Sequence, residues 1–159
     1  MGSRMTGPAN INPHIIETLY SEAMVLADNV RDAFDMSGRI SRLAEDEDLA
    51  RIALSCEALR ATTRMMHTIA WLLNQRAYFN GELSEFQLRR HGRLPRDKAA
   101  IDAENYALLD PALRELIGRT QRFHARIARL DNAWRDGFSA HPGAIHRLRD
   151  RLGQAVSRI

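Results

Sequence analysis

The hydrophobic residues between Leu49 and Phe79 form two seams on one long predicted helix. The first seam, at heptad positions a and d, consists of Leu49, Ile52, Cys56, Leu59, Thr63, Met66, Ala70, Leu73 and Ala77. The second, at positions c and f, consists of Leu54, Ala58, Ala61, Met65, Thr68, Leu72, then polar Gln75, and Phe79. These seams lie on nearly opposite sides of a helix. The helix therefore needs two surfaces to pack against, its own domain core and a second copy or partner.

Two further apolar stripes with spacings of three and four predict helices on either side of this one. The stripe before it consists of Ile16, Tyr20, Ala23, Ala27, Val30 and Phe34. The stripe after it consists of Leu109, Leu113, Leu116, Thr120, Phe123, Ile127, Leu130 and Trp134. Each begins near an N-cap residue followed by proline, at 12–13 and 110–111, which is typical of a helix start.

Glycines and turn residues predict where these helices end. We expect the first to stop at Gly38, the second at Gly81 and the third at Gly137, because glycine readily adopts the left-handed conformation of a helix C-terminus. Ser84 and Gln87 form a capping box for a short helix from about 85 to 91. Residues 92–106 show little periodicity, and we interpret them as a surface connection.

These elements predict an all-α fold, an antiparallel three-helix bundle with a long central second helix. The bundle would occupy residues 12–137 as one domain. Residues 1–11 are expected to be a disordered N-terminus, of which 1–4 resemble a cloning remnant. Residues 138–159 are expected to form a mobile tail or a short amphipathic helix.

The second seam of the central helix predicts how the bundle assembles. If both outer helices pack on the a/d seam, the c/f seam stays exposed in a monomer and needs cover. We therefore expect a homodimer in which second helices pair, with the interface at Leu54, Ala58, Ala61, Met65, Thr68 and Leu72. The alternative is that the third helix and the tail cover this strip within one chain.

Three blocks of sequence resemble the bacterial regulator of CtrA degradation family. The most specific block lies in the second helix, at residues 59–66, 70–77 and 81–83, with the sequences LRATTRMM, AWLLNQRA and GEL. Supporting blocks are LYSEA at 19–23, and LRELI at 113–117 with RIARLD at 126–131. The likeness covers most of residues 15–135, but not residues 92–106 or the chain after Gly137.

The resemblance implies a dimeric, non-enzymatic three-helix protein. Members of that family act as adaptors for the AAA+ protease ClpXP and help to deliver cell-cycle regulators for degradation. The implied partners are ClpXP components, and substrates or priming factors of the response-regulator type. From the residues we assign the partner-binding surface to Arg60, Arg64, Trp71 and Arg76, together with Arg147, Arg149 and Leu152 of the tail, because tryptophan and arginine are enriched at binding hot spots.

The sequence offers no catalytic, metal or cofactor site of its own. The six histidines, at 14, 67, 91, 124, 141 and 146, form no pair at the spacing a helical metal site requires. No glycine-rich phosphate loop is present, and no serine or cysteine lies beside a base in sequence. Cys56 lies within the a/d seam, which predicts a small core residue rather than a nucleophile. We therefore expect no enzymatic activity and no cofactor.

Charge and hydropathy restrict the remaining functions. No apolar run is long enough to span a membrane, and we expect a cytoplasmic protein. Residues 81–159 carry fifteen Lys and Arg against ten acids. A nucleic-acid-binding protein that uses this arginine-rich half is thus an alternative, although its interleaved acids make it the weaker one. A structural dimerisation module with no other partner is a further alternative.

Overall fold

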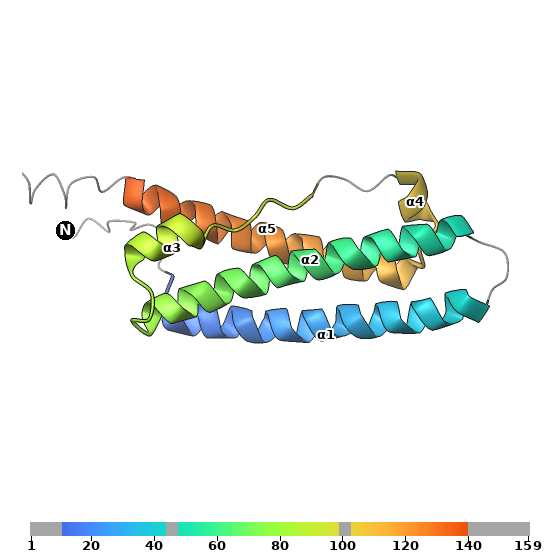
Figure 1. Ribbon diagram of the computed structural model, residues 1–159, viewed down its shortest axis with the longest axis horizontal. Helices are drawn as coiled ribbons and strands as arrows, with labels where there is room; N and C mark the ends of the chain where they lie inside the picture. The colour runs from blue at the N-terminus through green and yellow to red at the C-terminus, as the bar shows by residue number, and fades with distance from the viewer. Residues whose placement is uncertain (1–10, 44–47, 99–102, 140–159) are drawn as a thin grey trace, which may run out of the picture.

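The computed structural model describes residues 11–43, 48–98 and 103–139. Every regular element in these ranges is a helix: α1 (Pro13–Leu43), α2 (Asp48–Phe79), α3 (Glu85–His91), α4 (Ala103–Ala107) and α5 (Pro111–Ser139). The long helices α1, α2 and α5 lie alongside one another, and the two short ones lie near opposite ends of α2 (Figure 1). The prediction of an all-helical fold based on three long helices is confirmed.

The helix starts follow the capping residues found in the sequence. Asn12 accepts a hydrogen bond on Oδ1 from the Ile15 amide at 2.9 Å, which caps α1. Asp110 accepts one from the Ala112 amide at 2.8 Å at the start of α5. The predicted capping box between Ser84 and the third helical residue of α3 is also present. Each cap satisfies backbone donors that the first helical turn leaves without partners.

The helix ends agree with the sequence at α2 but not at α1 or α5. Gly81, with φ at 78°, follows α2, and the Glu82 amide donates to the Ala77 carbonyl at 2.9 Å, as at a glycine-terminated helix end. The expected stop of α1 at Gly38 is wrong, because α1 continues to Leu43. Likewise α5 continues past Gly137 to Ser139. Gly38 has no positive φ, and a glycine inside a helix lowers stability without ending the helix.

Successive long helices do not all alternate in direction, which differs from the expected antiparallel bundle. Arg64 of α2 bonds to Thr120 of α5, and Trp71, further along α2, bonds to Asp131, further along α5. The two helices therefore run in the same direction, while α1 runs opposite to both (Figure 1).

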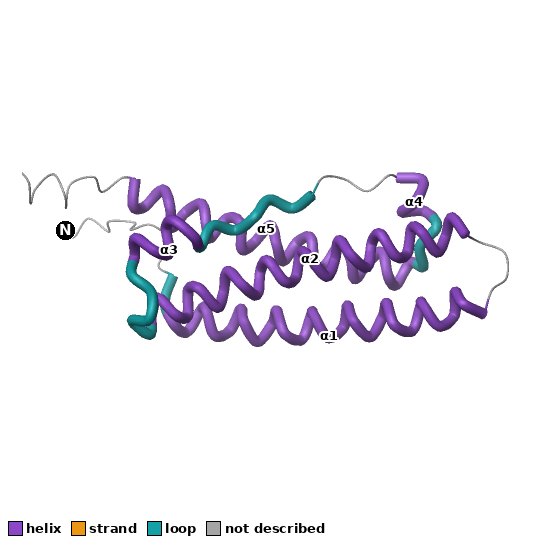
Figure 2. Tube along the Cα trace, viewed as in Figure 1, coloured by secondary structure: helices purple, strands orange, loops and turns teal. Residues whose placement is uncertain are grey.

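The connection between α3 and α5 makes this topology possible. Its residues 92–98 run from α3 back along the bundle (Figure 2). We call its extended residues 92–98 the strap. The strap is more than the surface connection that the sequence predicted, because Leu94 is buried in the hydrophobic core.

The core is built from one face of each long helix. From α1 it takes Ile16, Ala23 and Val30 of the predicted stripe together with Leu19 and Leu26, and from α5 mainly Leu116, Phe123 and Ile127. From α2 it takes Ala61, Met65, Trp71 and Leu72. The c/f seam of α2 therefore faces the core of its own chain, and the a/d seam faces outward.

This orientation corrects the predicted dimer interface. Within one chain Ala61, Met65, Thr68 and Leu72 are buried, and Leu54 and Ala58 are half-buried. The four buried residues are therefore not available to a second copy. The physical reason is that heptad position b lies next to f, at the edge of the c/f face, and this position carries Arg64 and Trp71, whose polar groups find partners on α5. Turning them inward rotates the a/d seam to the outside.

Candidate functional site

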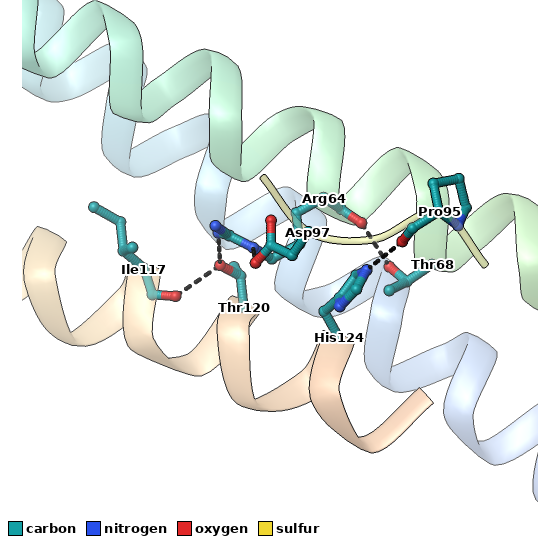
Figure 3. Close-up of polar contacts among 7 residues, drawn as sticks. All are labelled: Arg64, Thr68, Pro95, Asp97, Ile117, Thr120 and His124. Atoms are coloured by element: carbon teal, nitrogen blue, oxygen red, sulfur yellow. Dashed lines mark hydrogen bonds and ion pairs between the residues drawn. The ribbon is translucent and has the colours of Figure 1, made fainter. Parts of the chain in front are cut away.

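A polar network joins α2, the strap and α5 through Arg64. Its guanidinium donates from Nε to Oδ2 of Asp97 at 2.7 Å and from Nη1 to Oγ1 of Thr120 at 2.8 Å. Figure 3 shows Arg64 of α2 and Asp97 of the strap pointing toward one another, with Thr120 of α5 beside them. The Arg64 side chain is 2% exposed, so its charge relies on these partners instead of water. Arg64 thereby fixes the strap to the bundle.

Neighbouring polar groups extend this network. Thr120 donates its hydroxyl proton to the Ile117 carbonyl at 2.7 Å, and His124 Nε2 lies 3.0 Å from the Pro95 carbonyl oxygen of the strap (Figure 3). Thr68 donates to the Met65 carbonyl at 2.8 Å. These polar side chains are buried yet hydrogen-bonded, which makes their burial tolerable.

A second buried cluster centres on Asp131 of α5. Its carboxylate accepts from Trp71 Nε1 at 2.9 Å, from the Leu94 amide at 3.2 Å and from Arg135 Nε at 3.1 Å. These three donors come from α2, the strap and α5. Asp131 therefore joins α2, the strap and α5 near Leu94. Arg64 joins the same three segments near Asp97, further along the strap.

The structure buries Arg64 and Trp71, which were predicted to contact a partner, in the interior of the chain. The two side chains are nearly inaccessible and their donors are engaged inside the chain. Sequence periodicity alone placed Trp71 on the helix surface beside the arginines. The missed signal was Asp131, an acid that follows Leu130 in an otherwise apolar stripe and needs buried donors.

The other two predicted arginines lie at the surface but bind residues of their own chain. Arg60 donates to Oε1 of buried Glu57 at 2.8 Å. Arg76 donates to both carboxylate oxygens of Glu17 at 2.6 and 2.7 Å, and its guanidinium lies 4.0 Å from the Tyr20 ring centroid. The hydrogen bonds from Arg76 lower the pKa of Glu17, and the same pairing raises the pKa of Arg76. The predicted tail residues Arg147, Arg149 and Leu152 lie outside the described residues.

The a/d seam of α2 is the most extensive exposed apolar feature of this helix. Leu59 is 70% exposed and Met66 64%, and the large side chains exposed along the seam are Leu49, Ile52, Leu59, Met66 and Leu73. Cys56 lies on the same seam and is exposed, contrary to the expected core position. At 1.5 Å per residue, the seam from Leu49 to Leu73 extends over about 36 Å. An apolar strip of this length typically marks an interaction surface.

A groove of about 550 Å³ runs beside this seam, between α2 and the strap. It is lined by apolar Leu59 and by the basic residues Arg60, Arg96 and Lys98. The strap thus forms one wall of the groove beside the seam, and the hydrogen bond from Arg64 to Asp97 holds this wall in place.

Other site types find no support among the described residues. These residues contain no group of three or more histidine, cysteine or acidic side chains that could hold a metal ion. None of the helices described in ranges 13–43, 48–79 and 111–139 is long and apolar enough to cross a membrane.

The comparison with known proteins identifies a family and no individual relative. Residues 8–156 match a family described as "Protein of unknown function (DUF1465)". Neither a curated protein nor a solved structure matches the chain significantly. The family match spans nearly the whole sequence, and the chain therefore belongs to the DUF1465 family.

Proposed function

We propose that this protein is a non-enzymatic cytoplasmic adaptor that forms a homodimer through the a/d seam of α2 and helps deliver cell-cycle regulatory proteins to the ClpXP protease. The observation that carries the proposal is the exposed seam itself, a run of large apolar side chains in strict heptad register on the outer face of α2. A surface of this kind serves binding between helices, and adaptors act through binding alone.

The spacing of the seam favours a second copy as its occupant. A seam with residues alternately three and four apart is complementary to another helix with the same pattern, because side chains of one helix enter the spaces of the other. Two copies of this chain supply two such seams, and a two-fold axis brings the same surface of both together. We thus still propose the dimer expected from the sequence, but through the a/d seam instead of the c/f seam.

The adaptor role is supported by the resemblance of residues 59–83 to the regulator of CtrA degradation family. Tethering a substrate or a priming factor of the response-regulator type beside a protease raises its effective concentration and needs no catalytic residue. A dimer presents every binding surface twice, which further strengthens capture of a multivalent partner.

Affinity capture with purified ClpX tests the adaptor role. The wild type is compared with the double variant Leu59→Glu/Met66→Glu, which places charges on the seam, and with Phe86→Glu, which alters an equally exposed apolar residue of α3. An adaptor that depends on the seam is supported if the wild type and Phe86→Glu retain ClpX and the double variant retains less of it. If folded wild type retains no ClpX, the adaptor role is wrong, and a dimerisation module is the remaining reading.

A further inference from the structure

α1 and α5 enclose a groove that is lined by these two helices alone. Its volume is about 650 Å³. Four arginines spaced three and four apart along α5 line it, and they are Arg119, Arg122, Arg126 and Arg129. Val25 is exposed in the same groove, beside the buried side chains of Leu26 and Phe123. The groove is therefore basic along α5 and apolar at its base.

The positive charge of this groove is only partly neutralised. Arg126 pairs with Glu22 of α1, and its guanidinium lies 5.1 Å from the Phe123 ring centroid. Arg122 pairs with Glu115 at 2.8 Å. No acidic partner is found for exposed Arg119 or Arg129 within the described ranges. Among the residues that the structure describes, Glu22 is the only carboxylate that lines the groove together with the four guanidinium groups.

Arg119 also lines a second, larger cavity of about 790 Å³, so the two cavities adjoin at this residue. This cavity lies where α1, α2 and α5 meet, and its lining is largely apolar, including Ile40, Leu54 and Leu113. Its two carboxylates are engaged elsewhere: Asp32 pairs with Arg31, and Asp110 caps α5. The two cavities together offer a basic path that ends in an apolar pocket.

We infer that this continuous surface binds a linear segment of a partner protein that carries several acidic residues next to a large apolar anchor. The carboxylates of the segment would pair with Arg119 and Arg129, whose guanidinium groups suit bidentate carboxylate binding. The apolar anchor would enter the cavity beside Ile40 and Leu54. The inference rests on the proposed adaptor function, since it specifies the chemistry of the delivered protein.

The charge of the chain's two ends argues against either end as the occupant. Residues 1–10 contain no acid, and residues 140–159 contain four arginines and one aspartate. Neither end complements a basic groove. Nucleic acid is also disfavoured, because Glu22 would face its phosphates and the apolar base at Val25 and Phe123 offers them no hydrogen bond.

A peptide selection followed by titration tests the inference. A random 12-residue display library is selected on the folded full chain, and the enriched peptides are labelled with fluorescein and titrated by anisotropy. We expect enriched peptides that combine Asp or Glu with Leu, Ile or Phe. We also expect at least tenfold weaker binding when the acids of a peptide are replaced by their amides.

Three variants locate the binding site. Arg119→Glu/Arg129→Glu should weaken peptide binding at least tenfold, and Ile40→Glu should weaken it through the apolar pocket. Arg90→Glu/Arg93→Glu makes the same charge change at exposed arginines outside the groove and should leave binding unchanged. The inference is overturned if no acidic peptide is enriched, if the two double variants bind equally well, or if the groove prefers a DNA duplex with steep salt dependence.

The outcomes separate this inference from the proposed function. The seam variant Leu59→Glu/Met66→Glu tests assembly and ClpX capture and leaves the α1–α5 groove intact. Loss of peptide binding in Arg119→Glu/Arg129→Glu with ClpX capture preserved would confirm a separate cargo surface. If the chain binds the peptide but never captures ClpX, the groove is supported as a peptide-binding site and the adaptor role is wrong.

Discussion

Trp71 of α2 and Asp131 of α5 are joined by a hydrogen bond of 2.9 Å between the indole Nε1 and a carboxylate oxygen, and both side chains are buried. This pair fixes the rotation of α2 about its own axis. With Trp71 turned inward, the c/f seam joins the core and the a/d seam is left exposed. The proposed assembly surface is thus a consequence of an internal polar contact.

Replacing Asp131 by alanine should destabilise the fold strongly. The change removes the acceptor that Trp71 Nε1, the Leu94 amide and Arg135 Nε share. We expect a loss of about 3 kcal/mol in the free energy of unfolding, measured by urea denaturation. Asp136→Ala, at an exposed position of the same helix, serves as the control and should change stability by no more than about 0.5 kcal/mol. Equal effects of the two variants would contradict the buried network.

Replacing Arg64 by methionine should loosen the strap. The variant keeps an unbranched apolar side chain but loses the guanidinium and its bonds to Asp97 and Thr120. We expect about 2 kcal/mol of destabilisation and faster proteolysis within residues 92–98. Arg31→Met provides the matched control, because Arg31 makes only exposed ion pairs on α1, which contribute little. An unchanged cleavage rate in Arg64→Met would show that the strap is held by other contacts.

Gln75→Leu should stabilise the protein. Gln75 is fully buried in α2, and neither its amide nitrogen nor its amide oxygen has a hydrogen-bond partner among the described residues. A leucine of similar size removes two desolvated polar atoms, which predicts a gain of about 1 to 2 kcal/mol in the free energy of unfolding. The midpoint of urea denaturation reports the change. A less stable variant would indicate that the amide has a partner after all.

The ion pair between Glu17 and Arg76 should respond to acid. Because hydrogen bonding to Arg76 lowers the pKa of Glu17 below its ordinary 4.5, this contribution to stability is complete above that value. It is lost as the pH falls through the lowered pKa of the folded state. A carbon-detected NMR titration of the Glu17 carboxyl should show the lowered pKa in the wild type and a return toward 4.5 in Arg76→Ala. Identical titration curves would contradict the pairing.

The positions of the three long helices and of α3 could be predicted from sequence because the relevant signals are local, whereas α4 lies largely within the expected surface connection and was missed. The caps at Asn12, Ser84 and Asp110 act within three residues, and the spacing of apolar residues reveals each buried face. The ends of α1 and α5 were missed because glycine permits a helix end without requiring one.

The orientation of α2 could not be predicted because two seams of similar apolar content compete for the core. The choice depends on partners far away in sequence, such as Thr120 for Arg64 and Asp131 for Trp71. The direction of α5 depends similarly on the path of residues 92–98, which have no periodicity to read. Only one side of the arginine groove could be predicted. The sequence showed the spacing of Arg119 to Arg129 but not which residues of α1 face them.

The oligomeric state of the seam variant tests the central claim most directly. Sedimentation equilibrium would compare the wild type with Leu59→Glu/Met66→Glu and with the off-seam control Phe86→Glu. We predict a dimer for the wild type and the control, and a folded monomer for the double variant. A wild-type monomer at high protein concentration, or a dimer that survives both charges on the seam, would contradict the assignment of this surface.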